Sequence, residues 1–116
     1  EERPHPVFER DGSDLKFELP VSLSAAVLGG KVDAPALLGG TIAVDVPAGS
    51  QSGQVVRVRG RGLPGLRGGH GDAMAHLRVW IPSRVSGTER KLLEELGRSE
   101  NFKPPAGARS GAERGR

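Results

Sequence analysis

One glycine-rich segment of this 116-residue chain matches a pattern that performs chemistry in other proteins. Residues 60–65 read Gly-Arg-Gly-Leu-Pro-Gly, which fits the G-x-G-x-x-G pattern of dinucleotide-binding proteins. That pattern works when a strand leads into it and a helix leads out, so that helical amides face the pyrophosphate. Pro64 and the glycines after it cannot begin such a helix. We therefore predict that residues 60–71 form a mobile loop, with few side chains to anchor it, that holds no ligand.

The other polar residues do not form a catalytic or metal-binding pattern. Residues 49–53 read Gly-Ser-Gln-Ser-Gly, but a nucleophile elbow needs serine where this chain has Gln51. The chain has no cysteine, and its three histidines share no metal-ligand spacing. Most aspartates adjoin turns, where a carboxylate accepts hydrogen bonds from backbone amides. They are Asp11, Asp14, Asp33, Asp45 and Asp72. We predict no enzyme activity, no catalytic residue, no cofactor and no metal site.

Clustered arginines raise a second class of function, nucleic-acid binding. Arg57, Arg59, Arg61 and Arg67 lie within residues 46–71, which contain no acidic residue. Arg57 and Arg59 alternate with valines, as on the solvated face of a strand. Aromatic residues for base stacking are scarce, with three Phe, one Trp and no Tyr. The solvated face is the favoured interpretation, and a small nucleic-acid-binding β domain is the alternative.

The net charge of +3 comes from the end of the chain. Residues 1–96 hold 12 basic and 12 acidic side chains, whereas residues 97–116 hold five basic and two acidic ones. The Gly, Pro and Arg composition predicts a flexible basic tail over residues 98–116. No apolar run approaches the roughly 20 residues of a membrane-spanning helix, and the first residues do not resemble a secretory signal. We expect a soluble, cytoplasmic protein without membrane contact.

Alternating apolar and polar side chains predict a mainly β fold, a small two-layer β-sandwich of short strands. Clusters of Gly, Pro, Ser and Asp separate these strands. The expected strands cover residues 7–10, 15–19, 31–34, 42–46, 55–59 and 75–81. Trp80 points away from the face that carries Val79 and Ile81. We expect it to form a second core face, the alternative being an exposed contact residue.

Two short helices interrupt or follow the strands, the last at the C-terminal end. Ser22 can cap a helix over residues 23–28, which Gly29 and Gly30 end. Ser86, with Glu89 three residues later, predicts a capping box for a helix over about residues 87–96. This helix is short, so its apolar stripe needs a partner surface. The stripe consists of Leu92, Leu93 and Leu96.

A series of short motifs runs from residue 5 to residue 82. They read His-Pro-x-Phe-x-Arg-x-Gly-x-Asp-Leu at 5–15, Leu-Pro-Val-Ser-Leu at 19–23, Leu-Gly-Gly at 28–30, Val-x-Ala-Pro-x-Leu-x-Gly at 32–39, Val-Pro-x-Gly-x-Gln-x-Gly at 46–53, Arg-Gly-x-Gly-Leu-Pro at 59–64, Gly-Asp at 71–72 and Ile-Pro at 81–82. In this order and spacing, across residues 5–96, the chain resembles the C-terminal domains of DnaJ-type co-chaperones, the heat-shock protein 40 family.

The resemblance implies the second of the family's two β-sandwich domains, over residues 1–97, with a terminal dimerisation helix. In the first of those domains, client peptide lies in a shallow apolar groove between the strands that flank the short helix. The matching positions here are Phe17, Leu19, Ala34 and Ala36. The small alanines imply a shallow groove and weak binding.

The resemblance also implies partners. These are unfolded or misfolded polypeptides, a second copy of the chain, and a DnaK-type chaperone reached through missing parts of a parent protein, in protein folding and the stress response. Whole family members stimulate that chaperone's ATPase through a J domain with a His-Pro-Asp loop, whereas this chain has only His-Pro-Val at residues 5–7. The residues expected to join two copies are Leu92, Leu93, Leu96 and Phe102.

Overall fold

The structure is a computed structural model that describes residues 8–36, 39–65 and 68–105. It divides into two units, Glu1–Ile81 and Pro82–Arg116, each considered by itself below. Val7 of the first predicted strand and residues 106–116 of the predicted tail lie outside the described residues.

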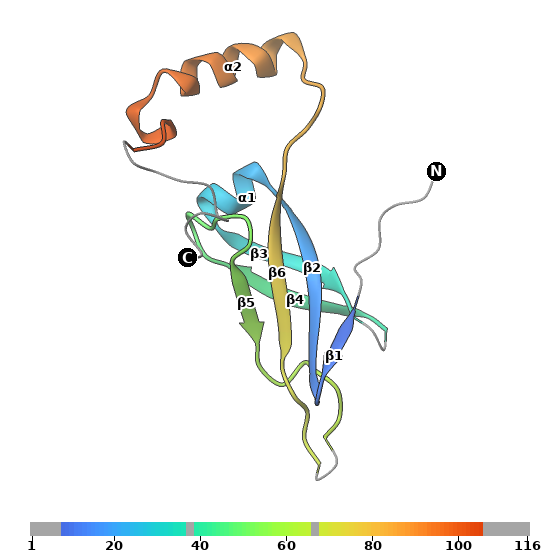
Figure 1. The fold of residues 1–116 in the computed structure, drawn as a ribbon. Coiled ribbons are helices and arrows are strands. Elements are labelled where there is room, and N and C mark those ends of the chain that lie inside the picture. The colour runs from blue at the N-terminus through green and yellow to red at the C-terminus, as the bar shows by residue number, and fades with distance from the viewer. Residues whose placement is uncertain (1–7, 37–38, 66–67, 106–116) are drawn as a thin grey trace. The chain divides into compact units, whose positions relative to one another are not determined.

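The first unit is built from two β-sheets (Figure 1). One sheet has four strands, in the spatial order β1 (Glu9–Asp11), β2 (Asp14–Ser22), β6 (Ala73–Trp80) and β5 (Val55–Val58). The other sheet pairs β3 (Gly30–Pro35) with β4 (Thr41–Val46). β2 and β6 run parallel, and the other neighbouring strands are antiparallel. The predicted mainly β, two-layer fold is confirmed.

The core lies between the two sheets and follows the period of two seen in the sequence. Every second residue of β2 is buried, from Leu15 to Val21. In β4 the residues Ile42, Val44 and Val46 alternate in the same way. Small residues of β6 and β3 complete the cluster and allow the layers to approach closely. These are Ala73, Ala75 and Ala34.

The helix α1 (Leu23–Leu28) begins and ends at the predicted residues. The Ser22 hydroxyl accepts a hydrogen bond from the Ala25 amide at 3.0 Å, which satisfies a free donor of the first turn. Gly29 ends the helix with φ of 81°, a conformation that glycine adopts without strain. Amides of Gly49 and Ser50 donate to the last carbonyls of α1 at 3.0 and 2.9 Å, which ties the helix to the turn after β4.

The second unit holds the helix α2 (Gly87–Gly97) and a single 3-10 turn, η1 (Glu100–Phe102). The predicted capping box is present: the Glu89 amide donates to the Ser86 hydroxyl at 3.1 Å, and the Ser86 amide donates to the Glu89 carboxylate at 2.8 Å. The 3-10 turn was not predicted. No helix in the described part of the chain is long and apolar enough to cross a membrane.

The expected second core face at Trp80 is wrong. The side chain is 54 % exposed. Two residues earlier on the same strand and the same face, Arg78 pairs with Glu18 of β2 at 3.5 Å. Trp80 therefore lies on the solvent side of its strand, as the alternative interpretation held.

Backbone hydrogen bonds anchor the glycine-rich segment between β5 and β6. The Leu63 amide donates to the Ser13 carbonyl at 2.8 Å, and the Gly62 amide donates to the Gly71 carbonyl at 2.8 Å. A Cβ on Gly62 would lie 2.5 Å from the Ser13 carbonyl oxygen, so only glycine allows this approach. The backbone thus holds this segment where side chains are few, and its mobility stays a prediction.

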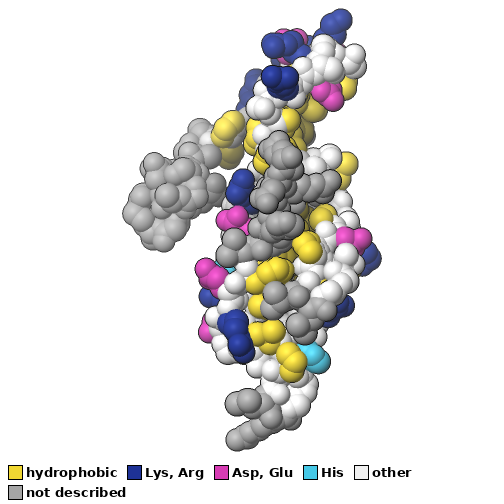
Figure 2. Space-filling view, turned by 90° about the vertical axis from the view of Figure 1, so that its right-hand side faces the viewer, with side chains coloured by type: hydrophobic (Ala, Val, Ile, Leu, Met, Phe, Trp, Pro, Cys, Tyr) yellow, Lys and Arg dark blue, Asp and Glu magenta, His cyan; other side chains and the backbone are white. Residues whose placement is uncertain are grey.

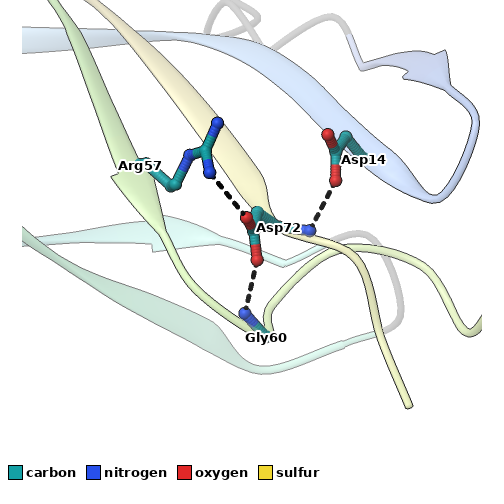
Figure 3. Close-up of polar contacts among 4 residues, drawn as sticks. All are labelled: Asp14, Arg57, Gly60 and Asp72. Atoms are coloured by element: carbon teal, nitrogen blue, oxygen red, sulfur yellow. Dashed lines mark hydrogen bonds and ion pairs between the residues drawn. The ribbon is translucent and has the colours of Figure 1, made fainter.

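Two aspartates fix the base of this segment, as expected of carboxylates beside turns (Figure 3). The Asp14 carboxylate accepts a hydrogen bond from the Asp72 amide at 2.8 Å. The Asp72 carboxylate accepts one from the Gly60 amide at 3.0 Å, and its other oxygen lies 3.3 Å from the Arg57 guanidinium. Asp72 thus joins the end of β5 to the start of β6.

We expect Asp72→Ala to lower the free energy of unfolding by about 1–2 kcal/mol, because it removes the acceptor of a backbone amide together with a partly exposed ion pair. Asp72→Asn should cost less, since its amide oxygen can still accept from Gly60. Urea denaturation followed by circular dichroism measures both. Asp33→Asn is the matched control, because Asp33 is exposed on β3 and has no hydrogen bond or ion pair with a described residue. Equal losses for Asp33→Asn and Asp72→Ala would contradict the anchoring role.

Candidate functional site

Several serines and carboxylates of the first unit have structural partners. The Ser50 hydroxyl donates to the Pro47 carbonyl at 2.5 Å, and the Ser52 hydroxyl accepts from the Val79 amide at 3.1 Å. On the second sheet, Lys31 and Asp45 pair across β3 and β4 at 2.8 Å, and this carboxylate raises the pKa of Lys31 above 10.5. Among the described residues, no three His, Cys, Asp or Glu side chains gather as a metal site would require. The serines, Lys31 and Asp45 thus form hydrogen bonds and an ion pair within the chain.

Two of the clustered arginines contact groups within the chain. Arg57 pairs with Asp72, and the Arg61 guanidinium donates to the Thr41 carbonyl at 3.1 Å. Arg59 is exposed, as expected for a solvated strand face, and Arg67 lies outside the described residues. These contacts give Arg57 and Arg61 a structural role, which favours the solvated-face interpretation over the nucleic-acid alternative.

The structure buries most of the residues expected to bind client peptide. Phe17, Leu19 and Ala34 are 2 %, 4 % and 0 % exposed and belong to the core cluster. Ala36 is partly exposed at the edge of that cluster. The side chains of the first three fill the space between the two sheets in this conformation, and their contact with a client stays a prediction.

Partly exposed apolar residues surround this core and form what we call the core rim: Phe8, Val32 and Ala36. The Phe8 ring packs on Phe17 with centroids 5.5 Å apart, so the rim continues the core outward. Figure 2 shows hydrophobic side chains reaching the surface in a line along one side of the sandwich, with charged side chains on both flanks. The sequence motifs pointed to this region, but strand alternation does not separate a rim residue from a core residue.

A pocket of about 280 Å³ lies where the glycine-rich segment meets the second sheet. Leu15 and Ile42, which are 2 % and 1 % exposed, form its floor. Leu63, Arg61 and His70 stand around it. This pocket was not predicted, because its walls come from segments that are far apart along the chain.

The residues expected to join two copies lie on the second unit and are exposed. Within α2 the stripe is open, at 55 % for Leu92, 45 % for Leu93 and 42 % for Leu96. Phe102 of η1 is 46 % exposed. The helix and the 3-10 turn contact each other, yet no residue of either is buried. The described part of this unit, residues 82–105, thus presents an apolar stripe that it does not cover itself.

Comparison with known proteins places this chain in a family. Residues 1–82 match the model of the DnaJ C terminal domain, a segment that ends where the first unit ends. The chain is 44 % identical over 109 residues to the chaperone protein DnaJ of Rhodobacter capsulatus, which covers 93 % of this chain and 28 % of that protein.

Two further relatives carry the same name. The chaperone protein DnaJ of Salinibacter ruber is 44 % identical over 105 residues, 90 % of this chain and 27 % of that protein. That of Leptospira biflexa is 41 % identical over 107 residues, 91 % of this chain and 28 % of that protein. This chain thus spans little more than a quarter of the length of each relative. Fold, motif order and these matches together show that the chain belongs to the DnaJ C-terminal domain family of chaperones.

Proposed function

We propose that this chain is the part of a DnaJ-type co-chaperone that holds unfolded polypeptide and joins two co-chaperone molecules. Family membership is the observation that carries the proposal. Cooperation with a DnaK-type chaperone belongs, in this proposal, to the longer protein, since the relatives extend well beyond the matched region. The chain's own task is contact with the client.

The core rim is the surface that we assign to the client. Phe8, Val32 and Ala36 are apolar and partly exposed, while the core behind them is rigidly filled. A client side chain can exchange water for apolar contact there. β3 lies at an edge of its two-stranded sheet, and an edge strand can pair with any extended backbone. Edge pairing that ignores sequence, combined with apolar contact, suits the capture of varied unfolded chains.

We expect the chain to suppress the aggregation of a denatured model protein only weakly, because the rim offers few apolar side chains. Val32→Asn should reduce the suppression further, since it places a polar group on the rim. Asp33→Asn, which changes the adjacent exposed residue of the same strand, is the control and should have no effect. Light scattering of the diluted, denatured protein measures all three. Equal suppression of aggregation by both variants would show that the core rim does not bind the client.

The same preparation should not raise the ATPase rate of a DnaK-type chaperone. The family resemblance assigns that activity to a His-Pro-Asp loop, and residues 5–7 read His-Pro-Val. Steady-state phosphate release measures the rate. Clear stimulation at a one-to-one ratio would show that the proposed division of tasks is mistaken.

The exposed stripe of α2 is the surface that we assign to a second copy. A helix of 11 residues is below the roughly 12–15 residues at which isolated helices become marginally stable, so packing has to supply the rest. The capping box fixes the start of the helix but leaves the stripe uncovered. A two-fold pair of such helices covers both stripes with one symmetric contact. Phe102 would extend that contact beyond the helix.

We expect Leu92→Asp combined with Leu96→Asp to give a folded monomer, whereas the unchanged chain forms a concentration-dependent dimer. Charge on the stripe opposes helix pairing, and the sandwich core is untouched. Sedimentation gives the mass, and circular dichroism reports the fold. Lys91→Gln with Glu94→Gln, on the opposite side of α2, should leave the dimer intact. Loss of the whole fold in the aspartate variant would instead indicate that the stripe packs on its own chain.

A further inference from the structure

The pocket beside the glycine-rich segment combines an apolar floor with a basic rim. Leu15 and Ile42 close the bottom, and Ala36 and Leu63 add partly exposed apolar walls. Its volume of about 280 Å³ is at the lower limit of pockets that hold drug-sized ligands. This size suits one side chain of a polypeptide better than a nucleotide.

The wall that carries Arg61 is fixed before any ligand arrives. The Asp72 carboxylate holds the Gly60 amide at 3.0 Å, as Figure 3 shows. Gly62 packs against the backbone of Ser13 with no room for a Cβ. A fixed wall lowers the entropy cost of binding, because few groups have to be ordered by the ligand.

The charge around the pocket is one-sided. Arg61 and His70 line it, and no carboxylate of the residues that the structure describes does so. Residues 47–71 contain no Asp or Glu. One Arg61 nitrogen donates to the Thr41 carbonyl at 3.1 Å, which aims the guanidinium while most of its five N–H donors stay available. A carboxylate placed beside the pocket would therefore meet an oriented cation.

We propose that this pocket takes one apolar side chain of an unfolded polypeptide whose neighbouring residue is acidic, with the acidic side chain seated against Arg61. The inference rests on the proposed client binding and adds a preference to it. It departs from the sequence-based expectation that residues 60–71 hold no ligand. The carboxylate is that of an internal Asp or Glu of the client and not its C-terminal carboxylate. Internal positions far outnumber chain termini in any unfolded protein.

The test uses fluorescent peptides with a background of Gly, Ser and Asn. Their central pairs are Leu-Glu, Leu-Gln, Leu-Lys and Ala-Glu, and a fifth peptide ends in a free C-terminal Leu. Fluorescence anisotropy with the full chain at low salt gives each affinity. Leu-Glu should bind about three to five times more tightly than Leu-Gln, the effect of one exposed ion pair, and Leu-Lys should be weakest. Ala-Glu should bind more weakly than Leu-Glu, because the alanine side chain is too small to fill the pocket above its apolar floor.

Arg61→Gln should remove the preference for Leu-Glu over Leu-Gln. Arg59→Gln is the matched control, because it removes an exposed charge two residues away that does not line the pocket. Leu63→Ala should weaken all the peptides with an internal Leu alike. An equal effect of Arg59→Gln would overturn the proposal in favour of diffuse charge, and tighter binding of the C-terminal Leu peptide would overturn it in favour of a chain terminus.

Failure of this proposal can be separated from failure of the proposed function. Equal affinity for all the peptides would reject the preference and leave client binding standing. Absence of binding by every peptide, together with no suppression of aggregation, would reject both.

Discussion

The parallel pairing of β2 with β6 is the interaction on which the rest of the first unit depends. It joins eight residue pairs, from Leu15 with Ala73 to Ser22 with Trp80. Parallel neighbours cannot be linked by a tight turn and need a crossover of a dozen or more residues. Here the crossover contains α1, the whole second sheet and β5. The second layer of the sandwich is therefore a consequence of the way in which the first sheet is connected.

This arrangement also decides which residues are left for function. β2 lies between β1 and β6, and its buried residues Phe17, Leu19 and Val21 share one core cluster with residues of the second sheet. The side chains of Phe17 and Leu19 are buried in the core. Apolar side chains that remain accessible lie where strands end or sheets have edges, as with Val32 on β3 and Leu63 beyond β5. The surfaces that we propose for client binding are accordingly margins of the core.

Local signals in the sequence were sufficient for the elements and insufficient for the site. Ser22, Gly29 and the capping box of Ser86 with Glu89 act within a few residues, and both helices begin where those residues predict. The contact of Asp14 with Asp72 joins residues 58 positions apart, and no short pattern encodes it. Trp80 illustrates the same limit, because alternation gives its side of the strand but not whether another layer covers that side. The pocket was not predicted for the same reason, because its lining residues lie far apart along the chain.

Weak contacts at such margins would become effective if the chain forms pairs. A partly exposed rim and a pocket for one side chain each offer little apolar area, so each contact alone is brief. Two copies joined through α2 would present each surface twice, and a client held by one copy would meet the second at a high effective concentration. Avidity of this kind strengthens holding without a deeper groove, and it keeps each contact easily broken. An unfolded chain has to be released before it can fold, so weak sites joined in pairs suit a protein that holds its client only for a time.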